Sequence, residues 1–233
     1  MGKYQLLLLD ADGTLFDFDR AEEYALEKTF LDFTIKPRPE YHYQFYREIN
    51  EAIWDEFEKG LISAEDLKAE RFNRLFTTLE LALDPKEFST KYLDNLGEAA
   101  FLLPGAPELV RLLAEDYHLV LLTNGLARVQ HKRLSLSPIE KYFKQIIISE
   151  EVGAAKPNPL IFSRALEAAG HQNKATTLMV GDSLSSDIKG GCTFGIDTCW
   201  YNPDRKTNDT SIQPTFEISQ LSQLKEILFS HNS

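Results

Sequence analysis

Short, continuous runs of apolar residues recur along this chain and, over its second half, alternate with amphipathic stretches. The runs cover residues 4–10 (YQLLLLD), 118–124, 145–149, 176–182 and 196–202. Apolar runs of this length without polar alternation are typical of strands that are buried on both faces of a parallel sheet. We therefore predict five parallel strands at these positions.

The segment between residues 20 and 98 has no such run, and its periodicity is helical. Two helix starts are well marked there. Residues 63–66 (SAED) resemble a capping box, and Asp84 precedes a proline and a glutamate that suit a first helical turn. We predict four helices in this segment, over residues 20–32, 41–58, 64–79 and 85–98.

Beyond residue 105, predicted helices alternate with the remaining strands. These helices cover residues 106–115, 127–136, 159–169, 186–194 and 220–229. Such alternation predicts an α/β fold, a doubly wound parallel sheet with helices on both faces. Because the all-helical segment follows the first strand, we predict two domains: an α/β core of residues 1–16 and 100–233, and an inserted helical cap domain of residues 17–99.

The charge of the chain restricts its partners. The 233 residues include 25 Lys+Arg and 36 Asp+Glu, a formal net charge of −11 at pH 7. This balance argues against a nucleic-acid polymer or an anionic membrane as partner, because both need a basic face. A small phosphorylated metabolite is compatible with it, since a bound cation and helix N-termini can reverse the local field. No feature of the sequence specifies an oligomeric state.

The cysteines and the first residues indicate the compartment. Cys192 and Cys199 are too few for a disulfide scaffold, and free thiols are typical of a reducing environment. The longest apolar run near the start, Leu6–Leu9, is too short for a signal sequence or a membrane span. We therefore expect a cytoplasmic protein.

Polar residues suited to catalysis follow the ends of the predicted strands. They are Asp10 and Asp12 after the first strand, Thr123 and Asn124 at the end of the second, Lys156 beyond the third, and Asp182 and Asp187 after the fourth. Ligands of open parallel sheets bind at this carboxyl edge. Four neighbouring carboxylates could not all stay ionised without a cation, and oxygen ligands without Cys or His favour Mg²⁺.

These motifs, DADGT at 10–14, TN at 123–124, Lys156 and GDSLSSD at 181–187, resemble those of the haloacid dehalogenase (HAD) superfamily of aspartate-nucleophile phosphohydrolases. The resemblance covers the whole chain and includes a C1-type helical cap between the first two motifs. The opening DADGTLFDFD is most similar to the pyrimidine nucleoside 5′-monophosphatase subgroup. The resemblance implies a Mg²⁺-dependent phosphomonoester hydrolase that acts through an aspartyl-phosphate intermediate.

Chemistry gives the matched residues distinct catalytic roles. The Asp10 carboxylate can attack phosphorus and hold the phosphoryl group, which divides one hard displacement into two easier ones. Asp12 is placed to protonate the leaving oxygen and later to deprotonate the attacking water. Thr123 would donate its hydroxyl to a phosphoryl oxygen, although an ordinary helix N-cap is the alternative reading of this residue alone.

The remaining matched residues would bind phosphate and metal. The Lys156 ammonium would neutralise the phosphoryl group and Asp10, and backbone N–H groups around Asn124 would assist Thr123 in binding phosphate. We expect Asp10, the carbonyl of Asp12 and Asp182 to bind Mg²⁺. The resemblance implies that Asp187 acts indirectly, by ordering a metal-bound water or Lys156.

Aromatic residues in and near the linker into the cap are candidates for substrate binding. Phe16 and Phe18 lie just after the first motif, and we expect them to form a wall of the substrate pocket. Tyr41, Phe45 and Ile49 share one face of a predicted helix and are expected mainly in the cap core.

The resemblance, together with these aromatic residues, implies hydrolysis of nucleoside 5′-monophosphates, with pyrimidine bases preferred. A phosphatase of another small metabolite, such as a sugar phosphate, and a phosphomutase would share every motif. A metal-free haloacid dehalogenase is disfavoured by Asp12, because the dehalogenases of the superfamily lack a carboxylate there. A non-catalytic binding protein is disfavoured because no catalytic residue of the pattern is missing.

Overall fold

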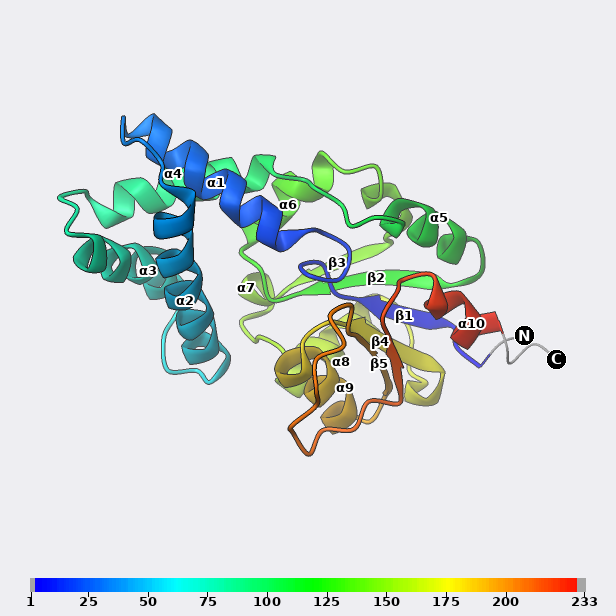
Figure 1. Ribbon diagram of the computed structural model, residues 1–233. Helices are drawn as coiled ribbons and strands as arrows, with labels where there is room; N and C mark the ends of the chain where they lie inside the picture. Colours follow the sequence, from blue (N-terminus) through cyan, green and yellow to red (C-terminus); the bar gives the residue numbers. More distant parts are fainter. Residues whose placement is uncertain (1–2, 230–233) are drawn as a thin grey trace. The chain divides into compact units, whose positions relative to one another are not determined.

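The computed structural model describes residues 3–229, and Figure 1 traces its elements. Within these residues one sheet contains six parallel strands in the order β3-β2-β1-β4-β5-β6. The strands are β1 (Leu6–Leu9), β2 (His118–Thr123), β3 (Gln145–Ile148), β4 (Thr177–Gly181), β5 (Asp197–Tyr201) and β6 (Phe216–Ile218). The predicted parallel α/β sheet is confirmed. The pattern did not reveal β6, because it has only three residues and follows a polar loop.

The centre of the sheet is β1, whose four leucines are all buried. Its last residue, Leu9, pairs with Leu121 of β2 on one side and Val180 of β4 on the other. Since parallel strands end at the same edge, residues that follow β1, β2 and β4 are brought together there. This edge is where the sequence places its candidate catalytic residues.

Helices cover both faces of this sheet, with α8 and α9 on one face and α5 on the other (Figure 1). The helices that follow the insertion are α5 (Ala106–Asp116), α6 (Ala127–Ser135), α7 (Ser149–Val152), α8 (Pro159–Ala168), α9 (Lys189–Phe194) and α10 (Gln223–Phe229). A π-helical turn over Leu184–Ile188 precedes α9, and 3₁₀ turns cover Glu140–Tyr142 and Lys174–Thr176. Between residues 3 and 229, no helix has both the length and the apolar character that a membrane span requires.

The inserted segment is all-helical, as predicted. Its helices are α1 (Phe18–Asp32), α2 (Pro39–Glu58), α3 (Ala64–Leu79) and α4 (Pro85–Glu98). Ser63 accepts a hydrogen bond from the N–H of Asp66 at the start of α3, and Asp84 caps α4 in the same way. At the centre of these helices the ring of Phe72 packs 5.0 Å from Phe88 and 5.1 Å from Tyr92, measured between ring centroids.

Internal contacts divide the chain into two compact units. The α/β unit comprises the residues up to Asp17, Leu102–Ala127 and the chain from Ser137 onward. The helical unit comprises Phe18–Phe101 together with Arg128–Leu136, which is most of α6 (Ala127–Ser135). The predicted division placed residues 128–136 with the α/β core, and its domain boundaries stay a prediction.

Candidate active site

The turn that follows β1 fixes the first candidate residue. The backbone N–H of Asp10 donates to Val180 O at 3.0 Å, and its side chain is buried. The chain then reverses through Gly13, whose φ of +78° favours glycine, and the Gly13 N–H donates to Phe16 O at 3.0 Å. This turn brings Thr14 back, so that its hydroxyl donates to Asp182 Oδ1 at 3.2 Å and lies 3.5 Å from Asp10 Oδ2.

Lys156 lies beside Asp10 and is 1% exposed. Its Nζ lies 2.5 Å from Asp10 Oδ1, 2.7 Å from Asp187 Oδ1 and 2.8 Å from Leu122 O. An ammonium has three N–H donors, so these three acceptors fix its position. Burial alone would lower the pKa of Lys156, but the carboxylates of Asp10 and Asp187 outweigh burial and raise it above its usual value. The side chain is therefore a cation at neutral pH.

The side chain of Asn124 holds the backbone at Lys156. Asn124 Nδ2 donates to Lys156 O at 2.9 Å, and the Lys156 N–H donates to Asn124 Oδ1 at 2.7 Å. This reciprocal pair joins the loop after β2 to the segment that carries the lysine. The neighbouring Thr123 is buried, and its hydroxyl oxygen accepts a hydrogen bond from the Gly125 N–H at 3.1 Å.

Two glycines make room for the carboxylates that follow β4. A Cβ at Gly13 would lie 2.5 Å from Asp182 Oδ2, and a Cβ at Gly181 would overlap the Asp187 carboxylate. The Ser183 N–H donates to Asp187 Oδ2 at 3.1 Å and holds this carboxylate in place. Both carboxylates are therefore packed against backbone that only glycine provides.

Three carboxylates meet at this edge of the sheet. Asp10, Asp182 and Asp187 each offer an oxygen, and these oxygens lie within 4.8 Å of one another. Burial raises the pKa of Asp182 to about 7, and the charge of Asp187 adds to the effect. Burial also raises the pKa of Asp10 well above its usual value, although Lys156 opposes this shift.

The charges of this cluster fit a divalent cation. Three ionised carboxylates and one ammonium give a net charge of −2, which a dication would balance. The donors are all oxygen atoms, the set that Mg²⁺ prefers. The cluster can therefore hold a metal ion, and a cation would keep Asp10 and Asp182 ionised at neutral pH by opposing the effect of burial.

Comparison with known proteins agrees with this geometry. The sequence model of the haloacid dehalogenase-like hydrolases matches residues 4–195, which span β1 to α9 and include each strand-end residue described above. The chain belongs to this family of hydrolases.

Two similar relatives in the family are nucleotidases by name. Pyrimidine 5′-nucleotidase YjjG of Escherichia coli is 34% identical over 229 residues, which are 98% of this chain and 100% of the relative. Pyrimidine 5′-nucleotidase PynA of Streptococcus pneumoniae is 37% identical over 226 residues, which are 97% of this chain and 95% of the relative.

A solved HAD hydrolase has nearly the same fold. The crystal structure of the HAD-hydrolase YfnB from Bacillus subtilis, determined with bound magnesium, matches this chain with a TM-score of 0.91 at 37% sequence identity. The match covers 97% of this chain and 99% of that chain. The expected fold of the HAD family is thereby confirmed.

The structure brings most of the predicted site residues together in the α/β unit. Asp10, Lys156 and Asp187 are in direct contact, and Asp182 completes the acidic group. Asp12 lies two residues beyond Asp10 in the turn and is half-buried. The contact of Asp187 with Lys156 is one of the two indirect roles expected for it. The metal-binding and catalytic roles of these residues stay predictions.

Phe16 and Phe18 belong to different units. Phe16 is fully buried, and its backbone forms isolated bridges with Asp12 and Leu102. Phe18 begins α1 in the helical unit, where its half-buried ring lies 5.9 Å from the guanidinium of Arg133. Phe16 is a core residue, so its ring does not form the pocket wall that was expected of it. The expected substrate contact of Phe18 stays a prediction.

Three features of the site were not expected from the sequence. Thr14 lies inside the DADGT motif, but no role was assigned to it. For Asn124, the expected role was phosphate binding by the backbone around it, and the contact of its side chain with Lys156 was not expected. Trp200, the third feature, donates from β5 to the carbonyl of Asp182. Thr14 could have been found from its motif, whereas the contacts of Asn124 and Trp200 join segments at least 18 residues apart.

Proposed function

We propose that this chain is a Mg²⁺-dependent phosphomonoesterase that acts through an aspartyl-phosphate on Asp10 and prefers pyrimidine nucleoside 5′-monophosphates. The observation that carries the proposal is the buried Asp10 carboxylate, held by Lys156 within an acidic group of net charge −2. The names of YjjG and PynA, at 34% and 37% identity over nearly full length, support the substrate class.

Asp10 and Asp12 carry the two chemical steps. In the first, an Asp10 oxygen forms a bond to phosphorus while the bond from phosphorus to the ester oxygen breaks, and Asp12 gives its proton to the leaving alcohol. In the second, water attacks the phosphoryl group and gives a proton to Asp12, which releases phosphate and regenerates Asp10. Proton transfer of this kind contributes about 10²- to 10⁴-fold in rate, so Asp12→Asn would lose most turnover.

Lys156 prepares Asp10 for this attack. Its ammonium holds one Asp10 oxygen in place and partly neutralises the carboxylate that an anionic phosphate must approach. Asp187 and Leu122 O fix the ammonium, and Asn124 fixes its backbone. In this proposal Asp187 orders Lys156 and does not contact the metal directly.

The proposed metal ligands are the carboxylates of Asp10 and Asp182 and the carbonyl of Asp12. A bound Mg²⁺ would neutralise negative charge on the phosphoryl group. Thr123 and the backbone around Asn124 would bind the phosphoryl oxygens. Phe18 would contact the base, whereas the fully buried ring of Phe16 has no exposed surface for such a contact.

The proposed partner is a small phosphorylated metabolite in the cytoplasm. The net charge of −11 disfavours a nucleic-acid polymer. Stacking of one base on an aromatic ring is worth about 1–3 kcal/mol, roughly 5- to 150-fold in affinity. A nucleotide would gain this stabilisation, and a sugar phosphate would not.

The test measures phosphate release from p-nitrophenyl phosphate, UMP, dTMP, AMP and glucose 6-phosphate, with Mg²⁺ or with EDTA. We expect Mg²⁺-dependent release, with a higher kcat/KM for UMP and dTMP than for glucose 6-phosphate. Asp10→Asn, purified in parallel, controls for contaminating phosphatase. A tenfold advantage for glucose 6-phosphate would refute the nucleotidase assignment, and equal rates in Mg²⁺ and EDTA would refute the metal assignment.

A further inference from the structure

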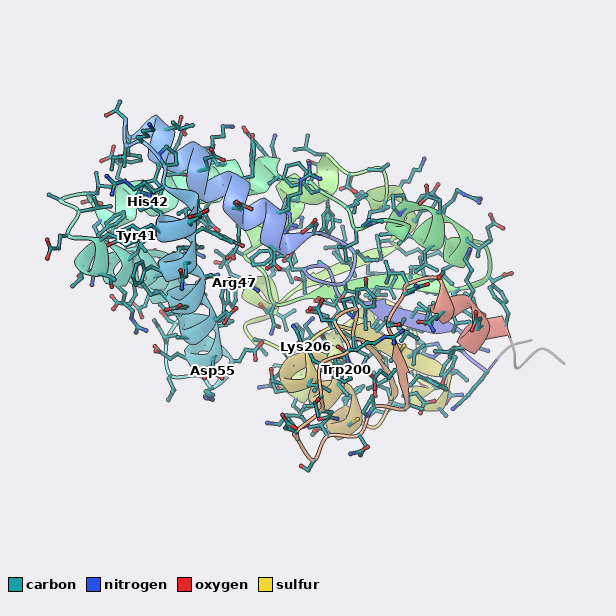
Figure 2. The ribbon with its side chains drawn as sticks, viewed as in Figure 1. Tyr41, His42, Arg47, Asp55, Trp200 and Lys206 are labelled. Carbon is teal, nitrogen blue, oxygen red and sulfur yellow. The ribbon has the colours of Figure 1, made fainter. Side chains whose placement is uncertain are left out.

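The carbonyl of Asp182 is held by a side chain with no part in the chemistry above. Trp200 Nε1 donates to Asp182 O at 2.8 Å. Trp200 belongs to β5, is 3% exposed and is labelled in Figure 2. Both residues lie in the α/β unit. One directional contact thus joins the interior of β5 to the peptide of a candidate metal ligand.

Strand pairing alone leaves this carbonyl in need of a donor. The paired part of β4 ends at Gly181, which faces Trp200 in the register, and Asp182 follows it. The N–H of Asn202, just after β5, donates to Ile218 O of β6 at 2.7 Å and is therefore not a donor to Asp182. The indole N–H supplies a bond to Asp182 where β4 turns away. A carbonyl shielded from water costs free energy when it has no such partner, and Asp182 is half-buried.

The Asp182 carboxylate tolerates little displacement. Its Oδ2 would lie 2.5 Å from a Cβ at Gly13, so it packs directly on that backbone. Its Oδ1 accepts the Thr14 hydroxyl at 3.2 Å. A shift of the Asp182 peptide would therefore displace the carboxylate and change its spacing to Asp10, because the oxygens of these two proposed ligands must stay close to bind one cation.

We propose that Trp200 is a positioning residue for the divalent-cation site, because its N–H fixes the Asp182 peptide and, through it, the carboxylate. The inference rests on the metal-binding role proposed for Asp182. It assigns to Trp200 a function beyond filling the core: the indole N–H, rather than the volume of the ring, sets the affinity of the site for Mg²⁺.

The chain allows the N–H to be removed without changing the shape of the ring. It has two tryptophans, Trp54 and Trp200, so Trp54→Phe leaves Trp200 alone. Growth of that variant in a tryptophan auxotroph with β-(3-benzothienyl)alanine replaces the indole N–H by sulfur. Isothermal titration calorimetry then gives the Mg²⁺ dissociation constant of the tryptophan and analogue proteins. Loss of one hydrogen bond should weaken Mg²⁺ binding by about threefold to tenfold.

A matched control separates this effect from the analogue itself. In Trp200→Phe, the analogue enters only at Trp54 of α2, and we expect the same Mg²⁺ affinity with tryptophan or analogue at that position. Urea unfolding in EDTA establishes that each protein is folded. With Trp200 as the sole tryptophan, its fluorescence should change on Mg²⁺ addition, with a midpoint that matches the calorimetric dissociation constant.

The outcomes are distinguishable. If the Trp54→Phe protein binds Mg²⁺ with the same affinity, within twofold, whether residue 200 carries N–H or sulfur, Trp200 is a core residue only and the inference is wrong. If the unmodified chain binds no Mg²⁺ in calorimetry, the proposed function fails at its metal site and the inference fails with it. Weaker binding by the folded analogue protein at residue 200, with no change in the control, supports the inference.

Discussion

The α/β unit and the helical unit each bury a group of charged and polar side chains, but the two groups differ in charge balance. At the sheet edge, Asp10, Asp182 and Asp187 meet one cation, Lys156. Among the helices, the carboxylate of Glu22 and the guanidinium of Arg71 are both buried, and the amide of Asn50 links them. We call the second group the helical cluster; it consists of Glu22, Asn50 and Arg71.

The helical cluster contains one charge of each sign, and the amide of Asn50 links them. Asn50 Nδ2 donates to Glu22 Oε1 at 2.5 Å, and Arg71 Nη1 donates to Asn50 Oδ1 at 3.4 Å. Arg71 is 2% exposed, and its guanidinium lies 5.0 Å from the ring centroid of Tyr92. Its three members come from α1, α2 and α3, so the cluster joins three helices.

The difference indicates which cluster is chemical and which is structural. A buried group with one charge of each sign needs no further ion, although losing either member leaves a buried charge unpaired. A buried group with net charge −2 is stable at neutral pH only when a cation joins it or protons bind to it. We therefore expect substitutions in the acidic group to alter catalysis and metal dependence, and substitutions in the helical cluster to alter stability.

The largest expected effect is that of Asp10→Asn. An amide cannot attack phosphorus, so kcat for p-nitrophenyl phosphate should fall by roughly 10³-fold or more. The comparison variant is Glu22→Gln, which makes a similar change of carboxylate to amide in the helical cluster. We expect that variant, where folded, to keep the Mg²⁺ dependence of the wild type. Substantial activity of Asp10→Asn would show that Asp10 is not the nucleophile.

The next effect concerns the stability of the helical cluster. Arg71→Met removes the buried guanidinium that is linked to Glu22 through Asn50, so the free energy of unfolding in urea should fall by about 3–5 kcal/mol. Glu22→Gln should lower the free energy of unfolding by a similar amount, because it removes the negative charge and keeps the buried guanidinium of Arg71. Because both changes remove the same interaction, the double variant should lose clearly less than the sum of the two.

A strictly additive double variant would contradict this view of the helical cluster. So would a large change in the Mg²⁺ concentration needed for half-maximal activity in a folded single variant. The second result would mean that the helical cluster acts on the metal site, and the contrast between the two clusters would then be lost.

Sequence reasoning could predict the acidic group but not the helical cluster. Asp10 and Asp182 follow apolar strands, and parallel pairing brings such positions to one edge without knowledge of any side-chain contact. Arg71 and Asn50 lie within amphipathic helices, where a polar residue is ordinarily exposed. Only the packing of three helices shows that these two are buried. The contacts of Asn124 and Trp200 could not be predicted either, because they join segments that are distant in the sequence.

The third prediction concerns the pH dependence of stability without metal. The pKa of Asp182 is raised from 3.8 to about 7 by burial, so the folded protein binds this proton more tightly than the unfolded chain does. The associated stability is complete below the unfolded pKa and is lost as pH rises through 7. In EDTA, wild type should therefore lose about 2 kcal/mol relative to Asp182→Asn between about pH 5.5 and pH 8.

Urea unfolding of both proteins at the two pH values measures this difference. Excess Mg²⁺ should reverse the trend at the higher pH, because a cation favours the ionised carboxylate of the wild type and the amide binds it less well. A difference between the two proteins that stays constant with pH would show that the pKa of Asp182 is not raised in the folded protein.

The smallest expected effect is that of Asn124→Ala, which tests how the α/β unit holds the buried ammonium of Lys156. The substitution removes the acceptor of the Lys156 N–H and the donor to Lys156 O, while Lys156 Nζ keeps its contacts with Asp10, Asp187 and Leu122 O. The ammonium should stay in place but be held less firmly, so kcat should fall by about tenfold, the equivalent of one or two neutral hydrogen bonds. Lys156→Met is the comparison, and it should lose far more activity because Asp10 and Asp187 then lose the ammonium that contacts both of them. Steady-state kinetics with p-nitrophenyl phosphate at saturating Mg²⁺ measures both. If Asn124→Ala lost as much as Lys156→Met, Asn124 would act on the substrate itself rather than through the backbone of Lys156.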